Sequence, residues 1–281
     1  MSPRPKTVTG LRAEPALAST TLTWEPLGWD PLIDHYRIYA VPGESAPSTT
    51  EETDLLAKTV YPLYRHTGLD PAGETWTYMV LAVSDAGRRG KPSPPETSAS
   101  QPSVTATGRE VAAIGTFDGR TLEFLHAPSG YATIPEQFPD AVIDYTQGTD
   151  SPGASWPYLL PGPEDAWAGR TPHRARWTLT LETEPVEDHD LAVWLVDTTR
   201  LGGTLQVRAN EEHLTDIELP LGATRGSREG DATVPGSTLR RSFHEVAVPA
   251  EVLQAGRNVL ELELTEGGWL AWDAVGLFAR T

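Results

Sequence analysis

The sequence predicts an all-β protein made of two β-sandwich domains. Its 281 residues are enough for two domains that each bury a hydrophobic core. The chain contains 25 glycines and 25 prolines, which separate many short runs bearing Thr and Val. This pattern is typical of short strands joined by turns. No apolar run approaches the roughly 18 residues of a transmembrane helix, so we expect two globular sandwiches rather than a membrane protein.

The charge of the chain is negative and unevenly distributed. Residues 1–101 carry 12 acidic and 9 basic side chains, whereas residues 102–281 carry 27 acidic and 13 basic ones, a net charge of −14. Such a field repels nucleic acids and anionic membranes, so we expect neither as a partner. We also expect the chain to be a monomer. The absence of cysteine excludes disulfides, zinc–thiolate sites and thiol nucleophiles.

The first ten residues, MSPRPKTVTG, lack the apolar segment of a secretory signal. The run Ser-Pro-Arg-Pro is typical of a linker. We therefore expect the chain to be part of a larger protein that acts outside the cell or at its surface. A cytoplasmic location is the alternative.

Residues 5–95 contain the strands of the first domain. The run TTLTWEP predicts a strand before a core tryptophan, Trp24, and DHYRIYAV alternates with Tyr36, Ile38 and Ala40 on one face. Together with the later segment HTGLDPAGETWTYMVLAVSDAG, these runs resemble a fibronectin type III domain. Trp76 stands where that fold usually has its corner tyrosine, and its indole N–H could replace the donated hydrogen bond. The resemblance implies a spacer; a partner-binding surface is the alternative.

The run SQPSV, residues 100–104, predicts the junction, so we place the domains at residues 1–101 and 102–281. The second domain opens with IGTFDGRTLEFLHA and continues, after a loop-rich stretch, with the strand RARWTLTLET, in which Trp177 is expected in the core. Four more strands are expected at LAVWLVDT, TLQVRAN, TDIELPL and SFHEVAVP. At the end, AEVLQA predicts a helical turn stopped by Gly256. The alternating strand VLELEL, the turn EGG and the closing strand WLAWDAVGLF follow it.

The beginning and end of this second domain resemble the C-terminal jelly roll, domain III, of family 4 polysaccharide lyases, the rhamnogalacturonan lyases. The likeness covers about 165 residues. It implies a carbohydrate-binding jelly-roll β-sandwich. In those lyases a lysine and a histidine of a large N-terminal β-domain carry out catalysis. Because residues 102–281 contain no lysine, we expect a non-catalytic region and no catalytic residues.

Aromatic side chains in loops are the main candidates for sugar binding, because sugar rings stack their C–H faces on aromatic rings. Trp156 and Tyr158 lie in a loop rich in Gly, Pro and Ser, and Trp167 lies three residues before Arg170 in another. Trp194 points away from the core face of its strand, toward a second apolar layer or a concave binding face. Arginines grip carboxylates at two points, so Arg170, Arg225 and Arg241 are candidates for binding uronates. The charge of −14 opposes an acidic ligand unless these arginines cluster.

A structural calcium ion is the one cofactor that the sequence suggests. Carbohydrate-binding jelly rolls often hold calcium near their first and last strands through oxygen ligands. Asp118 and Glu123 near the start, and Asp273 in the closing strand, could meet there. Alternatively, Asp273 caps a turn or pairs with an arginine.

The sequence therefore predicts a polysaccharide-binding accessory region: a type III spacer followed by a jelly roll that binds a plant-type or bacterial glycan. Two alternatives remain open. The first is part of a rhamnogalacturonan lyase or another polysaccharide lyase. The second is a structural or protein-binding module that binds no glycan.

Overall fold

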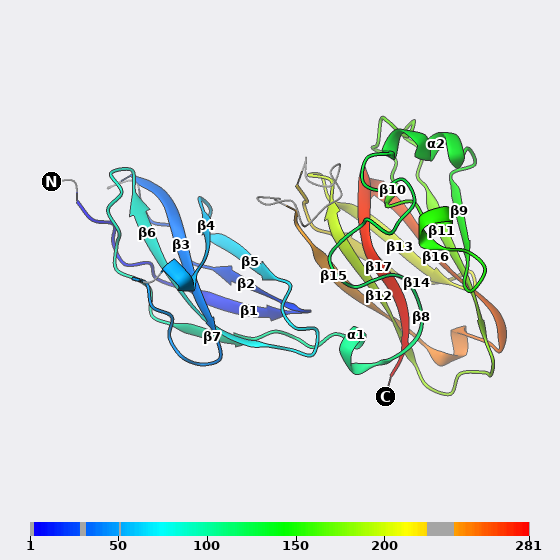
Figure 1. Ribbon diagram of the computed structural model, residues 1–281, viewed down its shortest axis with the longest axis horizontal. Helices are drawn as coiled ribbons and strands as arrows, with labels where there is room; N and C mark the ends of the chain where they lie inside the picture. Colours follow the sequence, from blue (N-terminus) through cyan, green and yellow to red (C-terminus); the bar gives the residue numbers. More distant parts are fainter. Residues whose placement is uncertain (1–2, 29–31, 51, 224–238, 281) are drawn as a thin grey trace. The chain divides into compact units, whose positions relative to one another are not determined.

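The computed structural model describes residues 3–28, 32–50, 52–223 and 239–280. The chain divides into two compact units, Met1–Ala106 and Thr107–Thr281, which we call the N-terminal unit and the C-terminal unit. Both are built from β-sheets (Figure 1). A short helix, α1 (Val104–Thr107), spans the division between them. The prediction of an all-β fold is confirmed.

The N-terminal unit is a sandwich of two antiparallel sheets. The first has three strands in the order β1–β2–β5, and the second has four in the order β4–β3–β6–β7. A single-turn helix, η1 (Glu52–Asp54), precedes β4. The strands are β1 (Arg12–Ala16), β2 (Ser19–Thr23), β3 (Ile33–Pro42), β4 (Leu55–Thr59), β5 (Leu63–Thr67), β6 (Thr75–Ser84) and β7 (Glu96–Ala99).

The core of this unit follows the predicted alternation. Tyr36, Ile38 and Ala40 of β3 are buried beside Trp24, whose ring centroid lies 5.2 Å from that of Tyr36 in an edge-on arrangement. The expectation for Trp76 is wrong, because its indole nitrogen is buried and makes no hydrogen bond. The hydroxyl of Tyr78, two residues later, instead lies 3.1 Å from Nδ1 of His66.

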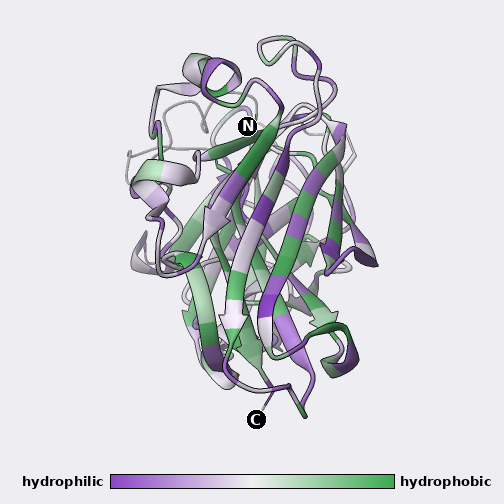
Figure 2. Cartoon of the chain, turned by 90° about the vertical axis from the view of Figure 1, so that its right-hand side faces the viewer, coloured by the Kyte–Doolittle hydropathy of each residue, from purple (hydrophilic) through white to green (hydrophobic). Residues whose placement is uncertain are grey.

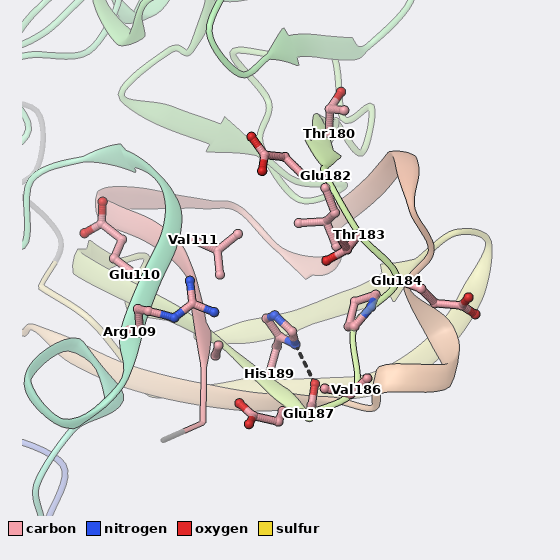
Figure 3. Close-up of a pocket in the computed structure, with 13 residues that line it drawn as sticks. Arg109, Glu110, Val111, Thr180, Glu182, Thr183, Glu184, Val186, Glu187 and His189 are labelled. Carbon is pink, nitrogen blue, oxygen red and sulfur yellow. Dashed lines mark hydrogen bonds between the residues drawn. The ribbon is translucent and has the colours of Figure 1, made fainter.

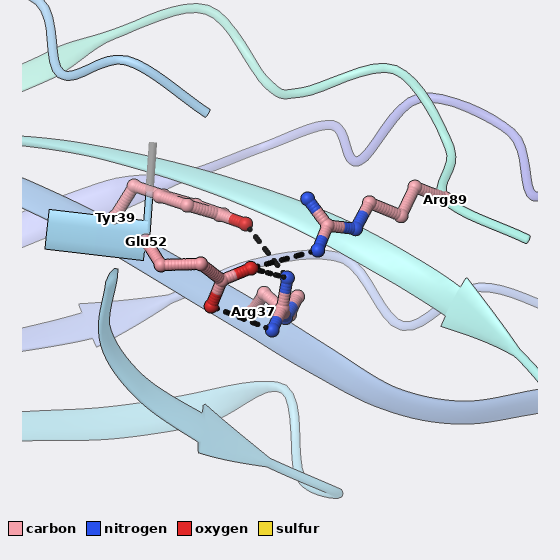
Figure 4. Close-up of polar contacts among 4 residues, drawn as sticks. All are labelled: Arg37, Tyr39, Glu52 and Arg89. Carbon is pink, nitrogen blue, oxygen red and sulfur yellow. Dashed lines mark hydrogen bonds and ion pairs between the residues drawn. The ribbon is translucent and has the colours of Figure 1, made fainter. Parts of the chain in front are cut away.

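The opposite face of β3 is closed by an ion-pair network. Arg37 is buried although it alternates with core residues, and its guanidinium donates two hydrogen bonds, of 2.9 and 3.1 Å, to the carboxylate of Glu52 (Figure 4). Arg89 donates to the same carboxylate at 2.8 Å, and Arg37 also donates to the hydroxyl of Tyr39. The hydrogen bonds and charge of Glu52 therefore offset the burial of the Arg37 guanidinium.

The C-terminal unit is a sandwich of two five-stranded sheets. In the first, β10, β17, β12 and β15 lie in that order and β8 also pairs with β17; the second has the order β14–β13–β16–β11–β9. All pairs are antiparallel except β9 with β11. The strands are β8 (Arg109–Gly115), β9 (Val142–Thr146), β10 (Leu159–Pro161), β11 (Arg174–Leu181), β12 (His189–Thr198), β13 (Gly203–Ala209), β14 (Glu212–Leu219), β15 (Ser242–Val248), β16 (Gly256–Gly267) and β17 (Trp269–Ala279).

Alternation explains the second sheet of this unit but not the first. In β16, Leu260, Leu262 and Leu264 enter the core, whereas Val259 lies on the other face and is half-buried. The strands that face the viewer in Figure 2 show this as hydrophobic and hydrophilic bands. By contrast, almost every residue of β12 and β17 is buried, because both faces of these central strands are covered.

Short helical turns lie outside the sheets. They are η2 (Tyr131–Thr133), α2 (Ile134–Gln137), α3 (Pro152–Ser155) and η4 (Ala250–Val252). The helical turn predicted at AEVLQA is η4, and it ends before Gly256, which opens β16 with φ +87°. Within the described residues, no helix is long and apolar enough to cross a membrane.

Candidate functional site

A loop after β10, residues 162–173, forms one wall of the candidate site. Its path begins at Gly162, whose N–H donates to the carbonyl of Gly268 at 2.7 Å. A Cβ at Gly162 would come within 2.5 Å of the carbonyl oxygen of Gly267, so only glycine fits this approach. The loop ends at His173, whose N–H donates to the carbonyl of Pro161 at 2.9 Å. Both ends are thus fixed to the sheet.

The carboxylate of Asp165 organises this loop from within. Its Oδ1 accepts the backbone N–H of Trp167 at 2.9 Å, and its Oδ2 accepts the hydroxyl of Tyr131 from η2. The carbonyl of Asp165 also accepts the N–H of Arg170 at 2.8 Å. Asp165 itself is buried, so a buried carboxylate links two aromatic residues that are 36 positions apart in the sequence.

Between these two aromatics lies a pocket of about 290 Å³. Ser129, Tyr131, Ala132, Tyr158 and Trp167 line it. Tyr158 is fully buried, and two backbone hydrogen bonds fix its position. Its N–H donates to the carbonyl of Leu125 at 3.0 Å, and its carbonyl accepts the N–H of Trp272 at 3.1 Å. Trp167 is 68% exposed. The pocket therefore has a buried phenol ring and an exposed indole among its walls.

The histidine that ends the loop stays uncharged near neutral pH. His173 is buried, and its Nδ1 lies 2.9 Å from the carbonyl of Thr171, which makes Nδ1 the protonated nitrogen. Burial lowers the pKa of His173 below its ordinary value, while the hydrogen bond to Thr171 and the charge of Asp165 act in the opposite direction. His173 therefore adds no positive charge at this end of the loop.

The structure separates the aromatic residues that the sequence grouped together. Tyr158 and Trp167 meet at the pocket, but Trp156 is fully buried in the core, 5.9 Å from Tyr145 and 5.6 Å from Trp272 between ring centroids. The expectation that Trp156 is a loop aromatic available to sugars is wrong, because its side chain is fully buried and has no surface left for a sugar to stack on. Tyr131 was not among the predicted candidates, although it opens η2 directly after a run rich in Gly, Pro and Ser, APSG.

Trp194 belongs to a second apolar layer. Its ring lies 5.2 Å from Phe117 and 4.5 Å from Phe243 between centroids, and Phe117 also contacts Phe278. This aromatic layer covers the outer face of the β17–β12–β15 part of the sheet. Trp194 is 5% exposed, so the structure contradicts the alternative of a concave binding face there.

The candidate arginines do not gather at the pocket. Arg170 is exposed at the end of the loop in the left-handed region, φ +59°, and is not among the lining residues. Arg241 is half-buried, and its guanidinium packs over Gly119, where a Cβ would collide with it. Arg225 lies outside the described residues. The uronate-binding cluster that the sequence suggested is therefore not formed by Arg170 and Arg241.

Asp273 caps a turn, which is one of the alternatives left open. Trp194 pairs with Ala274 and Leu195 with Trp272, so Asp273 is the extra residue of a β-bulge. Its Oδ1 accepts the N–H groups of Gly119, at 2.6 Å, and Arg120, at 3.1 Å, while Oδ2 is buried without a hydrogen-bond partner. Burial raises the pKa of Asp273 to about 7, and the charge of Asp118 acts in the same direction.

The other expected calcium ligands are not combined with Asp273 into a cage. Asp118 is exposed and lies 3.9 Å from Arg120, and Oε1 of Glu123 accepts the N–H of Thr116 at 2.9 Å. In the part of the chain that the structure describes, no three His, Asp or Glu side chains converge where they could hold a metal ion.

A second, larger cleft of about 480 Å³ lies at the other end of β17 (Figure 3). Its described lining has no aromatic sugar platform and four glutamates, namely Glu110, Glu182, Glu184 and Glu187. His189 is buried against it, with Nδ1 2.9 Å from the carbonyl of Glu187, and burial lowers its pKa, an effect that the charge of Arg109 reinforces. We regard the aromatic pocket as the stronger candidate, because three aromatic side chains line it and one of them, Trp167, is exposed for stacking.

Residues 111–277 match the family described as "CBM-like: Polysaccharide lyase family 4, domain III". The chain belongs to this family. Every residue that lines the aromatic pocket falls inside the CBM-like domain so defined, as do Asp165 and His173. A search of curated proteins finds no match.

Solved structures similar to this chain share low sequence identity with it. The fibronectin type III domain of human fibronectin type III domain containing protein 3 is 14% identical, over 38% of this chain and 95% of that one, with a TM-score of 0.32. Domains A168–A170 of titin are 21% identical, over 34% and 32%, with a TM-score of 0.27. Pectate lyase PelI from Erwinia chrysanthemi, in complex with tetragalacturonic acid, is 14% identical, over 38% and 31%, with a TM-score of 0.25. The matches thus span about a third of the titin and lyase structures, and fibronectin type III domains are among the neighbours.

Proposed function

We propose that this chain is a non-catalytic accessory region in which the CBM-like domain binds a polysaccharide through the pocket of Tyr131, Tyr158 and Trp167. The observation that carries the proposal is the exposed indole of Trp167 beside a pocket lined by two further aromatic rings. Aromatic rings bind the C–H faces of sugars, and nearby polar groups bond to their hydroxyls. Membership of a CBM-like family supports the same conclusion.

The pocket is also preorganised, which favours binding. Because Asp165 accepts hydrogen bonds from the hydroxyl of Tyr131 and from the backbone N–H of Trp167, a ligand does not have to order the Tyr131 side chain or the backbone at Trp167. Ordering a side chain on binding costs about 0.5–1.5 kcal/mol, so the hydrogen bond that already holds the Tyr131 hydroxyl improves affinity. The N-terminal unit serves as a spacer in this proposal, and the parent protein works outside the cell or at its surface.

Affinity electrophoresis against a panel of neutral and acidic polysaccharides tests the proposal. We expect at least one polysaccharide to retard the native chain, and Trp167→Ala to abolish most of the retardation. Tyr61→Ala is the matched control, because Tyr61 is equally exposed but lies in the N-terminal unit. If the panel retards neither the native chain nor the control, the chain is not a polysaccharide-binding module of this kind.

A further inference from the structure

The described residues that line the aromatic pocket carry no charge that could pair with an acidic sugar. Among the described residues that line it, three are aromatic, one is Ala132, and the only aliphatic hydroxyl is that of Ser129. No lysine or arginine is among them. An anionic sugar in this pocket would therefore lose hydration without gaining an ion pair, which is costly for a carboxylate.

A negative charge also lies directly behind the walls. The carboxylate of Asp165 accepts hydrogen bonds from the hydroxyl of Tyr131 and from the backbone N–H of Trp167. Its charge is therefore in direct contact with two of the residues that line the pocket. His173, at the end of the same loop, does not compensate this charge, since burial lowers its pKa. The exposed Glu164 next to Asp165 and the net charge of −17 act in the same direction.

The volume of the pocket limits how much of a chain enters it. At about 290 Å³, it lies at the lower edge of the roughly 300–1,000 Å³ typical of small-molecule sites. A pocket of this size suits one sugar ring rather than a run of rings. The buried ring of Tyr158 closes it on one side, and the exposed indole of Trp167 leaves the other side open.

From these observations we infer that the pocket holds a single neutral sugar residue and discriminates against uronates. This inference rests on the proposed function, because it concerns the same pocket. The ligand is an uncharged pyranose with an apolar C–H face that stacks on Trp167.

The test compares glycans that differ only in charge. Acidic polysaccharides and their carboxyl-reduced forms are titrated against the native chain and Trp167→Ala, and only the binding that Trp167→Ala removes is counted. We expect this binding to be at least about tenfold tighter for the reduced, neutral form of each matched pair that binds. Replacing the exposed Ala132 at the pocket wall, Ala132→Arg, should supply the missing cation and narrow the difference.

Each outcome decides between the two proposals. Equal or tighter binding of the acidic forms, dependent on Trp167, would overturn the charge selection and leave the proposed function standing. If Trp167→Ala weakens the binding of none of the acidic, reduced or neutral glycans, the proposed function is overturned as well. Tyr61→Ala should behave like the native chain throughout.

Discussion

The backbone N–H of Trp167 donates a 2.9 Å hydrogen bond to the buried carboxylate of Asp165. The same carboxylate accepts the hydroxyl of Tyr131, so one acidic side chain holds the Tyr131 side chain and the backbone at Trp167, two residues that line the pocket. The exposed indole is thus part of an ordered loop. This arrangement makes Asp165 a positioning residue for any ligand that stacks on Trp167.

Removing the carboxylate should weaken both stability and binding. Asp165→Ala leaves the Trp167 N–H and the Tyr131 hydroxyl without their acceptor, which costs about 1–3 kcal/mol for each donor that stays buried and unpaired. We expect a lower melting temperature and weaker glycan retention, measured by calorimetry and affinity electrophoresis. Glu164→Ala, an exposed neighbour, should change neither. If Asp165→Ala retains the glycan as the native chain does, Asp165 does not position the pocket.

Trp156 should matter for folding and not for sugar. Trp156→Phe reduces the packing against Tyr145 and Trp272, and changes of this size in a packed core cost about 1–3 kcal/mol. Denaturant unfolding should show this loss, whereas glycan affinity measured well below the melting temperature should stay within about twofold of the native value. A selective loss of affinity at unchanged stability would contradict the core assignment.

The pH dependence of stability should show the raised pKa of the buried Asp273 carboxyl. Its folded pKa of about 7 lies above the value of about 3.9 expected when unfolded, so the folded state favours the protonated form. The resulting stability is complete below the unfolded pKa and is lost as the pH rises through about 7. Asp273→Asn, which keeps an oxygen acceptor for Gly119 and Arg120, should therefore remove this loss, which falls between about pH 4 and pH 7.

Thermal unfolding at a series of pH values measures the effect. Asp140→Asn, at an exposed position of the same unit, controls for the change in net charge. The histidines His173 and His189 of this unit titrate in the opposite sense, because burial lowers their pKa values and destabilises the fold at acid pH. An unchanged pH profile in Asp273→Asn would show that the buried carboxyl contributes nothing to it.

Calcium should not stabilise the chain through Asp118, Glu123 and Asp273. The Oδ1 atom of Asp273 already accepts two N–H groups, and Glu123 accepts the N–H of Thr116. The remaining oxygens of these carboxylates do not converge, because no three His, Asp or Glu side chains of the described residues meet where they could hold a metal ion. We expect the same melting temperature with millimolar calcium and with a chelator. A melting temperature that rises steadily with the calcium concentration, as ligand linkage requires, would contradict this account.

The sequence predicted strands well where one face of the strand is buried. It did not predict which loop aromatics are buried, because their partners come from distant parts of the chain. The alternation of β16 was visible because its leucines share one face. Trp156 and Trp167 lie in loops of similar composition, yet one is fully buried and the other is 68% exposed. The difference arises from Tyr145 on β9 and Trp272 on β17, which local sequence does not bring together. Tyr131 was missed for a related reason, because its link to Asp165 spans 34 positions.

Isothermal titration of the best-binding glycan against the native chain, Trp167→Ala and Tyr61→Ala tests the central claim most directly. Loss of aromatic stacking and of the buried area that goes with it costs on the order of 1–3 kcal/mol, or about tenfold or more in affinity. We expect this loss for Trp167→Ala at an unchanged melting temperature, and we expect a native affinity for Tyr61→Ala. Native affinity in Trp167→Ala would contradict it, because the glycan would then bind elsewhere on the chain.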